Sequence, residues 1–266
     1  MTTSTLRPVP RADCIADAAG GITFDVVGAD SPQAALVLKR RGGGKAPEDE
    51  LRLPLTPLGG GVSRAVLPST VELAEGRWDA RTDDGVALEP GIRDLRAIVD
   101  RTPGDGADRI AVRVPYPTAD GRLAVRCWVR APHAEAGAIG LAPEAGTMSV
   151  EGLLYGTELG EGAVAEARLS SGGRVHEVPV TGEGRAFGFT LPYAPISDTP
   201  PGKEQLWELW LRPARDADGI RISRILDDIW DKKGIFVYPR QTTDSYRAAP
   251  CYTGDNDLCV RLTAAG

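Results

Sequence analysis

Short runs of alternating hydrophobic and polar residues recur along this 266-residue chain. Clear examples lie at 35–38, 207–211 and 258–262, and Gly, Pro and Asp residues separate the runs. A period of two places successive side chains on opposite faces, which is typical of antiparallel strands with one buried face. Asp-Gly pairs such as Asp120-Gly121 fit the tight turns between them. The pattern predicts an all-β protein.

One segment departs from this alternation. Ile222, Ile225, Leu226 and Ile229 recur at helical spacing, which predicts a short helix over residues 221–233.

The chain also contains an internal repeat. Residues 115–126 (PYPTADGRLAVR) and 250–261 (PCYTGDNDLCVR) share Pro, Thr, Asp, Leu, Val and Arg at one constant offset. Further matches follow in the same order: 53–56 with 178–181, 67–68 with 191–192, Trp78-Asp79 with Trp207-Glu208, and 93–100 with 224–231. We therefore expect two tandem immunoglobulin-like β-sandwich domains from a duplication, at 12–128 and 129–266, after a disordered tail at 1–11.

Charge and composition narrow the class of partner. A formal net charge of −6 argues against the basic face that nucleic acids require, so no nucleic acid partner is expected. No stretch approaches the roughly 20 apolar residues of a membrane-spanning helix, so we expect no membrane insertion. Residues 1–9 lack a secretory pattern, which favours the cytoplasm. Arg greatly outnumbers Lys, as in proteins from GC-rich genomes such as those of actinobacteria.

The residues that could carry catalysis or bind a metal form no complete set. His133 and His176 are the only histidines, and neither lies beside a nucleophile motif. Cys14, Cys127, Cys251 and Cys259 form no CxxC or Cys/His cluster and are expected to be reduced and buried. We therefore assign no catalytic residue, no metal ligand and no cofactor.

Two further motifs have simpler explanations. The glycine-rich stretches 40–45 and 59–64 lack the spacing of a phosphate-binding loop and are expected to be hairpin loops. Residues 227–231 (DDIWD) match the magnesium-diphosphate string of terpene synthases, which are all-helical. Here the three acids precede Lys232 and Lys233, so local pairing on a polar helix face is the preferred interpretation.

The aromatic residues suggest a ligand site in the second copy. Trp207 aligns with Trp78 and should anchor the core. Alternation places Trp210 on the opposite face with Glu208 and Arg212, where the first copy has Arg81. The residues that would form an aromatic platform for a sugar are Trp210, Tyr238, Tyr246 and Tyr252, with Phe236 nearby. Burial of these rings against residues 221–233 or the first domain is the alternative, and the sequence leaves it open.

The segments 252–261, 224–233 and 236–239 resemble closing segments of β-rich regions appended to actinobacterial glycosyltransferases of cell-wall polymer synthesis, including CDP-glycerol glycerophosphotransferase-like proteins. The α/β catalytic domain of that family is absent from these 266 residues. The resemblance implies a non-catalytic binding or scaffolding module whose partner is a glycosyltransferase or a glycopolymer.

Two other functions remain open. One is an enzyme of glycoside or phosphate-ester chemistry that uses carboxylates such as Glu204, Glu208, Asp227 and Asp228. The other is a structural oligomer that pairs through open strand edges. The sequence does not fix the oligomeric state.

Overall fold

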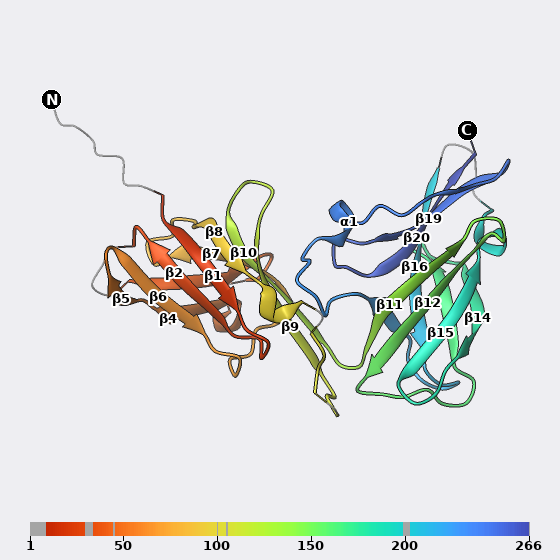
Figure 1. The fold of residues 1–266 in the computed structure, drawn as a ribbon, viewed down its shortest axis with the longest axis horizontal. Coiled ribbons are helices and arrows are strands. Elements are labelled where there is room, and N and C mark those ends of the chain that lie inside the picture. Colours follow the sequence, from red (N-terminus) through yellow and green to blue (C-terminus); the bar gives the residue numbers. More distant parts are fainter. Residues whose placement is uncertain are drawn as a thin grey trace. The chain divides into compact units, whose positions relative to one another are not determined.

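The computed structural model describes residues 9–29, 34–44, 46–99, 101–104, 106–198 and 203–265. These residues form twenty strands, three short 3-10 turns and one four-residue α-helix, which confirms the all-β class (Figure 1). Among them, no helix is both long enough and apolar enough to cross a membrane. Most of the tail predicted to be disordered lies outside the described residues, and the first strand already begins at Arg11.

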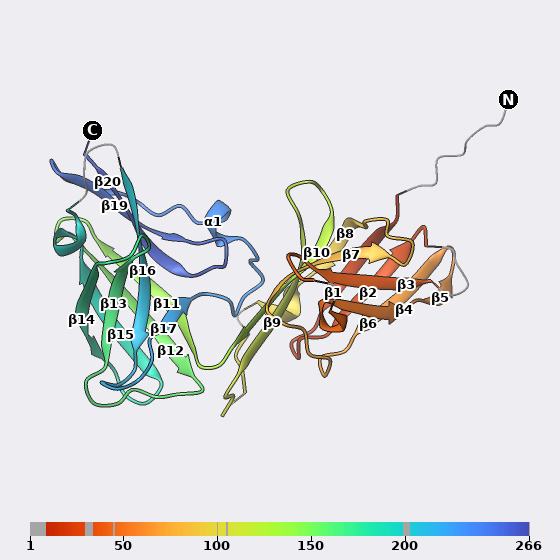
Figure 2. The ribbon, with the colours of Figure 1, turned by 180° about the vertical axis from the view of Figure 1, so that it is seen from behind.

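The chain folds as two compact units. Unit 1 comprises Met1–Thr102, Ala111–Val129 and Leu226–Trp230, and unit 2 comprises Pro103–Ile110, Arg130–Ile225 and Asp231–Gly266. Figure 2 shows the strands of each unit from behind.

Unit 1 contains two five-stranded sheets, with strand orders β5-β6-β2-β1-β8 and β4-β3-β7-β10-β9. Alternation along β7 points Trp78, Ala80 and Thr82 inward, where they are buried. The strands are β1 (Arg11–Ala16), β2 (Ile22–Val27), β3 (Ala35–Arg40), β4 (Glu50–Pro54), β5 (Thr56–Gly59), β6 (Val62–Leu67), β7 (Gly76–Thr82), β8 (Glu89–Asp94), β9 (Ile110–Pro117) and β10 (Leu123–Arg130), with 3-10 turns η1 (Pro47–Asp49) and η2 (Arg96–Ile98).

Unit 2 contains one ten-stranded sheet around a core of buried apolar residues. Its elements are β11 (His133–Ala142), β12 (Thr147–Tyr155), β13 (Val164–Leu169), β14 (Val175–Thr181), β15 (Ala186–Pro192), η3 (Ala194–Ile196), β16 (Glu204–Arg212), β17 (Ile220–Ser223), α1 (Lys232–Ile235), β18 (Gln241–Thr242), β19 (Tyr246–Tyr252) and β20 (Leu258–Ala264).

The sheet of unit 2 closes on itself, so this unit is not clearly the two-sheet sandwich that the sequence predicted. β14 pairs with both β13 and β15, and β17 pairs in parallel with β11 and antiparallel with β16. Because β13 and β16 also pair, seven strands form a barrel-like ring. The second edge of β16 is shared: β17 pairs with Trp210 and Leu211, while β20 pairs with 204–208.

The helix predicted over 221–233 is largely wrong. Residues 220–223 form β17, and only Lys232–Ile235 are helical, after Asp231 has capped that turn by accepting a hydrogen bond from the Gly234 N–H. Ile222 is buried in the strand and Ile225 follows it, so a helical spacing arose from a strand and the loop behind it. A short apolar run does not distinguish the two by periodicity alone.

The two units share a set of strand pairings. The antiparallel pairs β1–β2, β2–β6, β3–β4, β3–β7 and β7–β10 of unit 1 correspond in order to β11–β12, β12–β15, β13–β14, β13–β16 and β16–β20 of unit 2. The parallel pair β1–β8 corresponds to β11–β17. Even the register agrees, because Trp78 lies opposite Val125 and Trp207 opposite Val260.

The turn of the last hairpin is also the same in both units. The Gly121 N–H donates to the Thr118 carbonyl, and the Asn256 N–H donates to that of Thr253. Gly121 has φ 75° and Asn256 has φ 60°, a left-handed conformation that Gly and Asn adopt most readily. The repeat 115–126/250–261 therefore encodes one hairpin twice.

Candidate functional site

A pocket of about 290 Å³ lies on the outer face of β16, β20 and β19 in unit 2, and we call it the hairpin pocket. Strand pairing sets its floor in rows across the sheet. One row is Arg247, Thr263 and Glu204, and the next contains Ala249 and Arg261, with Cys251 one step further along β19. Alternation sends Ala248, Tyr252 and Leu262 to the opposite, buried face, so these side chains form the core beneath the floor.

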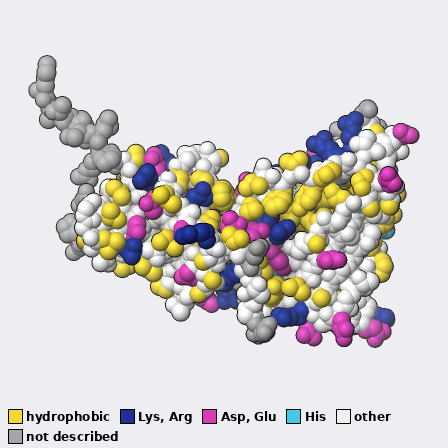
Figure 3. Space-filling model, in the orientation of Figure 1, with side chains coloured by type: hydrophobic (Ala, Val, Ile, Leu, Met, Phe, Trp, Pro, Cys, Tyr) yellow, Lys and Arg dark blue, Asp and Glu magenta, His cyan; other side chains and the backbone are white. Residues whose placement is uncertain are grey.

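The segment after α1 forms the wall of the hairpin pocket. Phe236 and Tyr238 pack against the core, with ring centroids 5.7 Å and 6.3 Å from Tyr252. The hydroxyl oxygens of Tyr238 and Tyr252 are 3.3 Å apart. Val237, between the two wall aromatics, is 88% exposed. On the face seen in Figure 3, hydrophobic side chains gather over the region of α1, β19 and β20, with Lys and Arg side chains near the far end of these strands.

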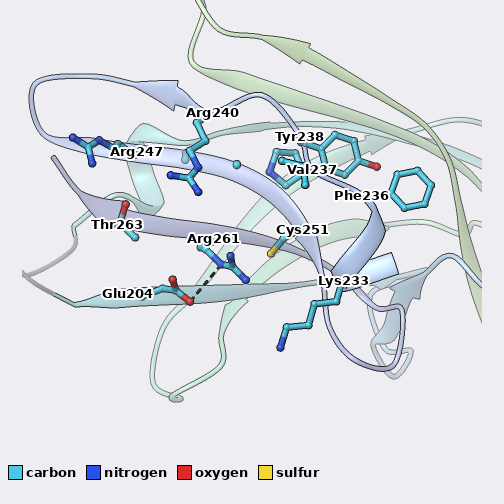
Figure 4. A pocket seen from close by; sticks show the side chains of 13 residues that line it. Glu204, Lys233, Phe236, Val237, Tyr238, Arg240, Arg247, Cys251, Arg261 and Thr263 are labelled. Atoms are coloured by element: carbon cyan, nitrogen blue, oxygen red, sulfur yellow. Dashed lines mark ion pairs between the residues drawn. The ribbon is translucent and has the colours of Figure 1, made fainter. Parts of the chain in front are cut away.

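The charges of the hairpin pocket are unbalanced. Four cationic side chains line it, from Lys233, Arg240, Arg247 and Arg261, against the single carboxylate of Glu204. The Nε of Arg261 lies 3.3 Å from Glu204, the ion pair dashed in Figure 4. Burial raises the pKa of the Cys251 thiol, an effect that Arg261 and Lys233 partly oppose. The pocket therefore holds a neutral thiol among excess positive charge.

Of the four predicted ligand-binding residues, the structure brings Tyr238 and Tyr252 into contact. Tyr238 lines the hairpin pocket, and Tyr252 lies beneath Tyr238 with 1% of its surface exposed. Tyr246 is 7% exposed and belongs to the core. Binding by these residues remains a prediction, with Tyr238 the one placed at a cavity.

Trp210 lies on the outer face of β16, as the alternation predicts, but not at the hairpin pocket. The guanidinium carbons of Arg168 and Arg221 lie 4.3 Å and 4.9 Å from its ring centroid. These arginines come from β13 and β17, the strands on either side of β16. The indole N–H donates to Glu208 at 3.3 Å. Any flat ligand stacking on Trp210 would have to compete with these two guanidinium groups.

An ion-pair network surrounds Trp210. Glu166 accepts hydrogen bonds from Arg168 and Arg212, at 2.7 Å and 2.8 Å. Arg221 pairs with Glu208 and with the buried Asp257, at 3.2 Å and 2.9 Å. The charges around Trp210 are thus paired within the chain, whereas in the hairpin pocket Arg261 is the one cation that has an ion pair with a described residue.

Several candidates for catalysis and metal binding have structural partners, whereas the buried Nε2 of His176 has no hydrogen-bond partner among the described residues. The Nε2 of His133 is 2.7 Å from Glu135, whose carboxylate accepts a hydrogen bond from the Ile225 N–H. In the DDIWD string, Asp227 accepts from the Ile229 N–H and Asp231 caps α1. Over the part of the chain that the structure describes, no three His, Cys, Asp or Glu side chains group as metal ligands do. None of the four cysteines forms a disulfide, and Cys251 alone is partly exposed.

The cationic residues of the hairpin pocket were missed in the sequence. Lys233, Arg240, Arg247 and Arg261 are dispersed along the chain, and arginine is common throughout it. Strand register brings them together. The period-two placement of Arg247 and Arg261 on the outward faces of 246–252 and 258–264 was the one signal available.

Comparison with known proteins gives little that is specific. No family model matches the chain, and no curated protein matches it. Among solved structures, the crystal structure of S. aureus TarS, a cell-wall teichoic acid glycosyltransferase, matches 62% of this chain and 29% of its own, with 13% identity and a TM-score of 0.39. A structure of TarS residues 217–571 matches 68% of this chain and 54% of its own, with 13% identity and a TM-score of 0.29. The chain thus spans less than two thirds of the length of either structure.

Proposed function

We propose that this chain is a non-catalytic binding or scaffolding protein of cell-envelope glycopolymer assembly, with the hairpin pocket as its ligand site. The observation that carries the proposal is the convergence of an aromatic wall and several cations on one concavity. Pockets that combine apolar walls with a few polar groups are the usual sites for small ligands.

The wall suits a saccharide. Tyr238 and Phe236 are fixed from behind by Tyr252, so the loop that carries them is held against the sheet. Tyrosine offers an apolar ring together with a polar hydroxyl, as a sugar with one apolar face and a hydroxyl edge requires. Of the four residues predicted from sequence, Tyr238 is the one we place in direct contact with the ligand.

Catalysis by paired carboxylates is the less favoured function. Glu204 and Glu208 lie four residues apart on one strand, which separates their Cα atoms by about 13 Å at the usual rise per residue. Glycosidases hold their two carboxyl groups roughly 5 to 10 Å apart. Glu204 pairs with Arg261 and Glu208 with Arg221, while Asp227 and Asp228 belong to unit 1.

We also propose that the two units descend from one duplicated immunoglobulin-like domain, of which unit 2 is a closed variant. The shared pairings and the common register of Trp78 and Trp207 support this origin.

A partner enzyme, such as a glycosyltransferase, would bring the polymer to the pocket. A structural oligomer is the third proposal, and light scattering tests it.

A pocket-filling variant tests the binding function. Ala249→Trp places a large side chain on the floor of the pocket, and Val175→Trp places the same side chain on β14, at a position that is 58% exposed. We expect the full chain to bind a sugar-substituted cell-envelope polymer in isothermal titration. Ala249→Trp should bind at least tenfold more weakly, while Val175→Trp binds like the parent chain.

Thermal unfolding of both variants should show that each retains the fold. The binding function is wrong if the parent chain binds no such polymer, or if Ala249→Trp, folded, binds it as well as the parent does.

A further inference from the structure

We infer that the hairpin pocket recognises a phosphate group on a saccharide-containing ligand, an inference that rests on the proposed binding function and specifies its ligand. The whole chain has a formal net charge of −6, yet this one pocket has four cations and one carboxylate in its lining.

Most other arginines of unit 2 already have acidic partners. Ion pairs join Arg168 and Arg212 to Glu166, and Arg221 to Asp257 and Glu208. By contrast, the side chains of Lys233, Arg240 and Arg247 form no ion pair with a described residue, and only Arg261 has Glu204 beside it. The pocket therefore concentrates cations whose charge is not balanced within the described part of the chain.

The geometry of the sheet brings these charges within reach of one anionic group. Arg247 lies opposite Thr263, and Arg261 lies opposite Ala249 in the next row of the same face. Residues on such a diagonal lie about 7–8 Å apart, so two long arginine side chains can converge on one group. In Figure 4, Arg240 lies beside Arg247 toward one end of the pocket, Lys233 lies toward the other, and Arg261 lies between them.

Small side chains leave the room for that group. Ala249, Cys251 and Thr263 form the floor between the cations. Guanidinium donors match phosphate oxygens in a planar fork, and the ammonium of Lys233 adds a mobile point charge. A pocket lined by several cations and one carboxylate that is already ion-paired suits a ligand phosphate. It suits a ligand carboxylate less well, because a carboxylate carries a single charge. The aromatic wall of Phe236 and Tyr238 then lies beside the phosphate, where a sugar ring would stack.

A double charge reversal on exposed arginines tests the inference on the full chain. Arg240→Glu/Arg247→Glu and the control Lys203→Glu/Arg215→Glu change the net charge equally, and all four residues are exposed. The probes are glucose, glucose 1-phosphate, glucuronate, inorganic phosphate and an oligomer of glycerol phosphate.

We expect glucose 1-phosphate to bind at least tenfold more tightly than glucose and more tightly than glucuronate. Arg240→Glu/Arg247→Glu should lose this preference at least tenfold, while the control pair keeps it. Raising the NaCl concentration should weaken phosphate binding, because salt screens exposed charges. Tighter binding of the glycerol phosphate oligomer than of glucose 1-phosphate assigns the phosphate to a polymer backbone, and the reverse order assigns it to a phosphorylated sugar.

Equal affinity for glucose and glucose 1-phosphate overturns the inference, as does a charge reversal with no more effect than its control. In that case, the binding function is still supported if the envelope polymer binds and Ala249→Trp abolishes that binding. If inorganic phosphate alone binds as tightly as every phosphorylated sugar, the saccharide part of the inference is wrong. If Ala249→Trp, while folded, leaves the binding of the envelope polymer unchanged, the proposed function itself fails.

Discussion

The outer face of the last hairpin has opposite character in the two units. At the constant offset of the repeat, Arg247, Ala249 and Thr263 of unit 2 correspond to Val112, Val114 and Trp128 of unit 1. The three residues of unit 1 are at most 1% exposed, whereas their counterparts line a cationic pocket. Within unit 1, Trp230 also stacks on Tyr116, the counterpart of Cys251, with ring centroids 6.2 Å apart.

The inner face shows no such divergence. Trp78 and Trp207 are 0% and 1% exposed, and each lies opposite a buried valine on the last strand. A packed core tolerates little change in volume, while an outward position is free to vary without loss of the fold. The inner face, which the two units share, therefore maintains the fold. The outer face, which differs between them, is where a function specific to one unit would arise.

The largest effect should come from the matched core tryptophans. Trp78→Ala and Trp207→Ala each remove a fully buried side chain and should lower the free energy of unfolding by about 3–5 kcal/mol. Because the two positions correspond, the two losses should be similar. Chemical denaturation, with proteolytic cleavage within each unit as the readout, measures both losses of stability. A negligible loss at either position would show that the two tryptophans are not structurally equivalent.

Substitutions of the two left-handed turn residues, Asn256 and Gly121, should have smaller effects on stability than those of the core tryptophans. The two substitutions should also differ from each other. The Oδ1 of the buried Asn256 accepts a hydrogen bond from the Lys232 N–H at 3.0 Å, whereas the corresponding Gly121 has open space around it. Asn256→Gly keeps the backbone conformation but leaves that N–H without its acceptor, at a cost of about 1–3 kcal/mol. Gly121→Asn should leave the stability nearly unchanged. Thermal unfolding of both variants measures the difference. Equal effects would mean that the side chain of Asn256 contributes nothing beyond its backbone preference.

Trp210 and its counterpart Arg81 form the next comparison. Trp210→Ala should cost about 1–2 kcal/mol, since it removes two guanidinium–indole contacts from a partly exposed site. Arg81→Ala should lower the free energy of unfolding by less than about 0.5 kcal/mol, because the ion pair of Arg81 with Asp79, at 3.9 Å, lies on the surface. Trp210→Ala should leave polymer binding at the hairpin pocket unchanged. A loss of binding by the folded variant would move the ligand site onto Trp210.

The smallest effect concerns a surface ion pair of unit 1. Arg64 donates two hydrogen bonds to Asp25 across β6 and β2, at 2.7 Å and 2.8 Å, and thereby lowers the pKa of Asp25 below 3.8. The pair stabilises the fold above pH 3.8, and this contribution is lost as the pH falls through the lowered pKa of Asp25. Arg64→Ala should lower the stability slightly at pH 7 and leave it unchanged in strong acid, because an exposed ion pair contributes little.

NMR titration of Asp25 measures the same interaction directly. Its pKa should rise toward 3.8 in Arg64→Ala, and an unchanged value would show that Arg64 is not the cause of the shift. In unit 2, the corresponding β12–β15 pair places Glu151 opposite Gly188, so no equivalent cross-strand pair is expected there.

How much the sequence predicted depended on whether the determining contacts were local. Alternation along 207–211 correctly placed Trp207 inside and Trp210 outside, because strand geometry alone decides that. The spacing of Ile222, Ile225 and Leu226 was misleading, because the pairing of β17 with β11 and β16 is non-local. The hairpin pocket was missed for the same reason: only the register of β19 and β20 brings Arg247 and Arg261 together.

The shared second edge of β16 also affects how the chain is made. β13 is synthesised before β16 and β17 follows closely, so the ring can close early. The half of β16 that pairs with β20 must wait until Leu258 and the residues after it have left the ribosome. Unit 1 repeats the delay, because β7 waits for β10. During each interval a half-strand exposes unpaired N–H and C=O groups, and nascent chains stalled there should be the ones that chaperones bind and that aggregate most readily.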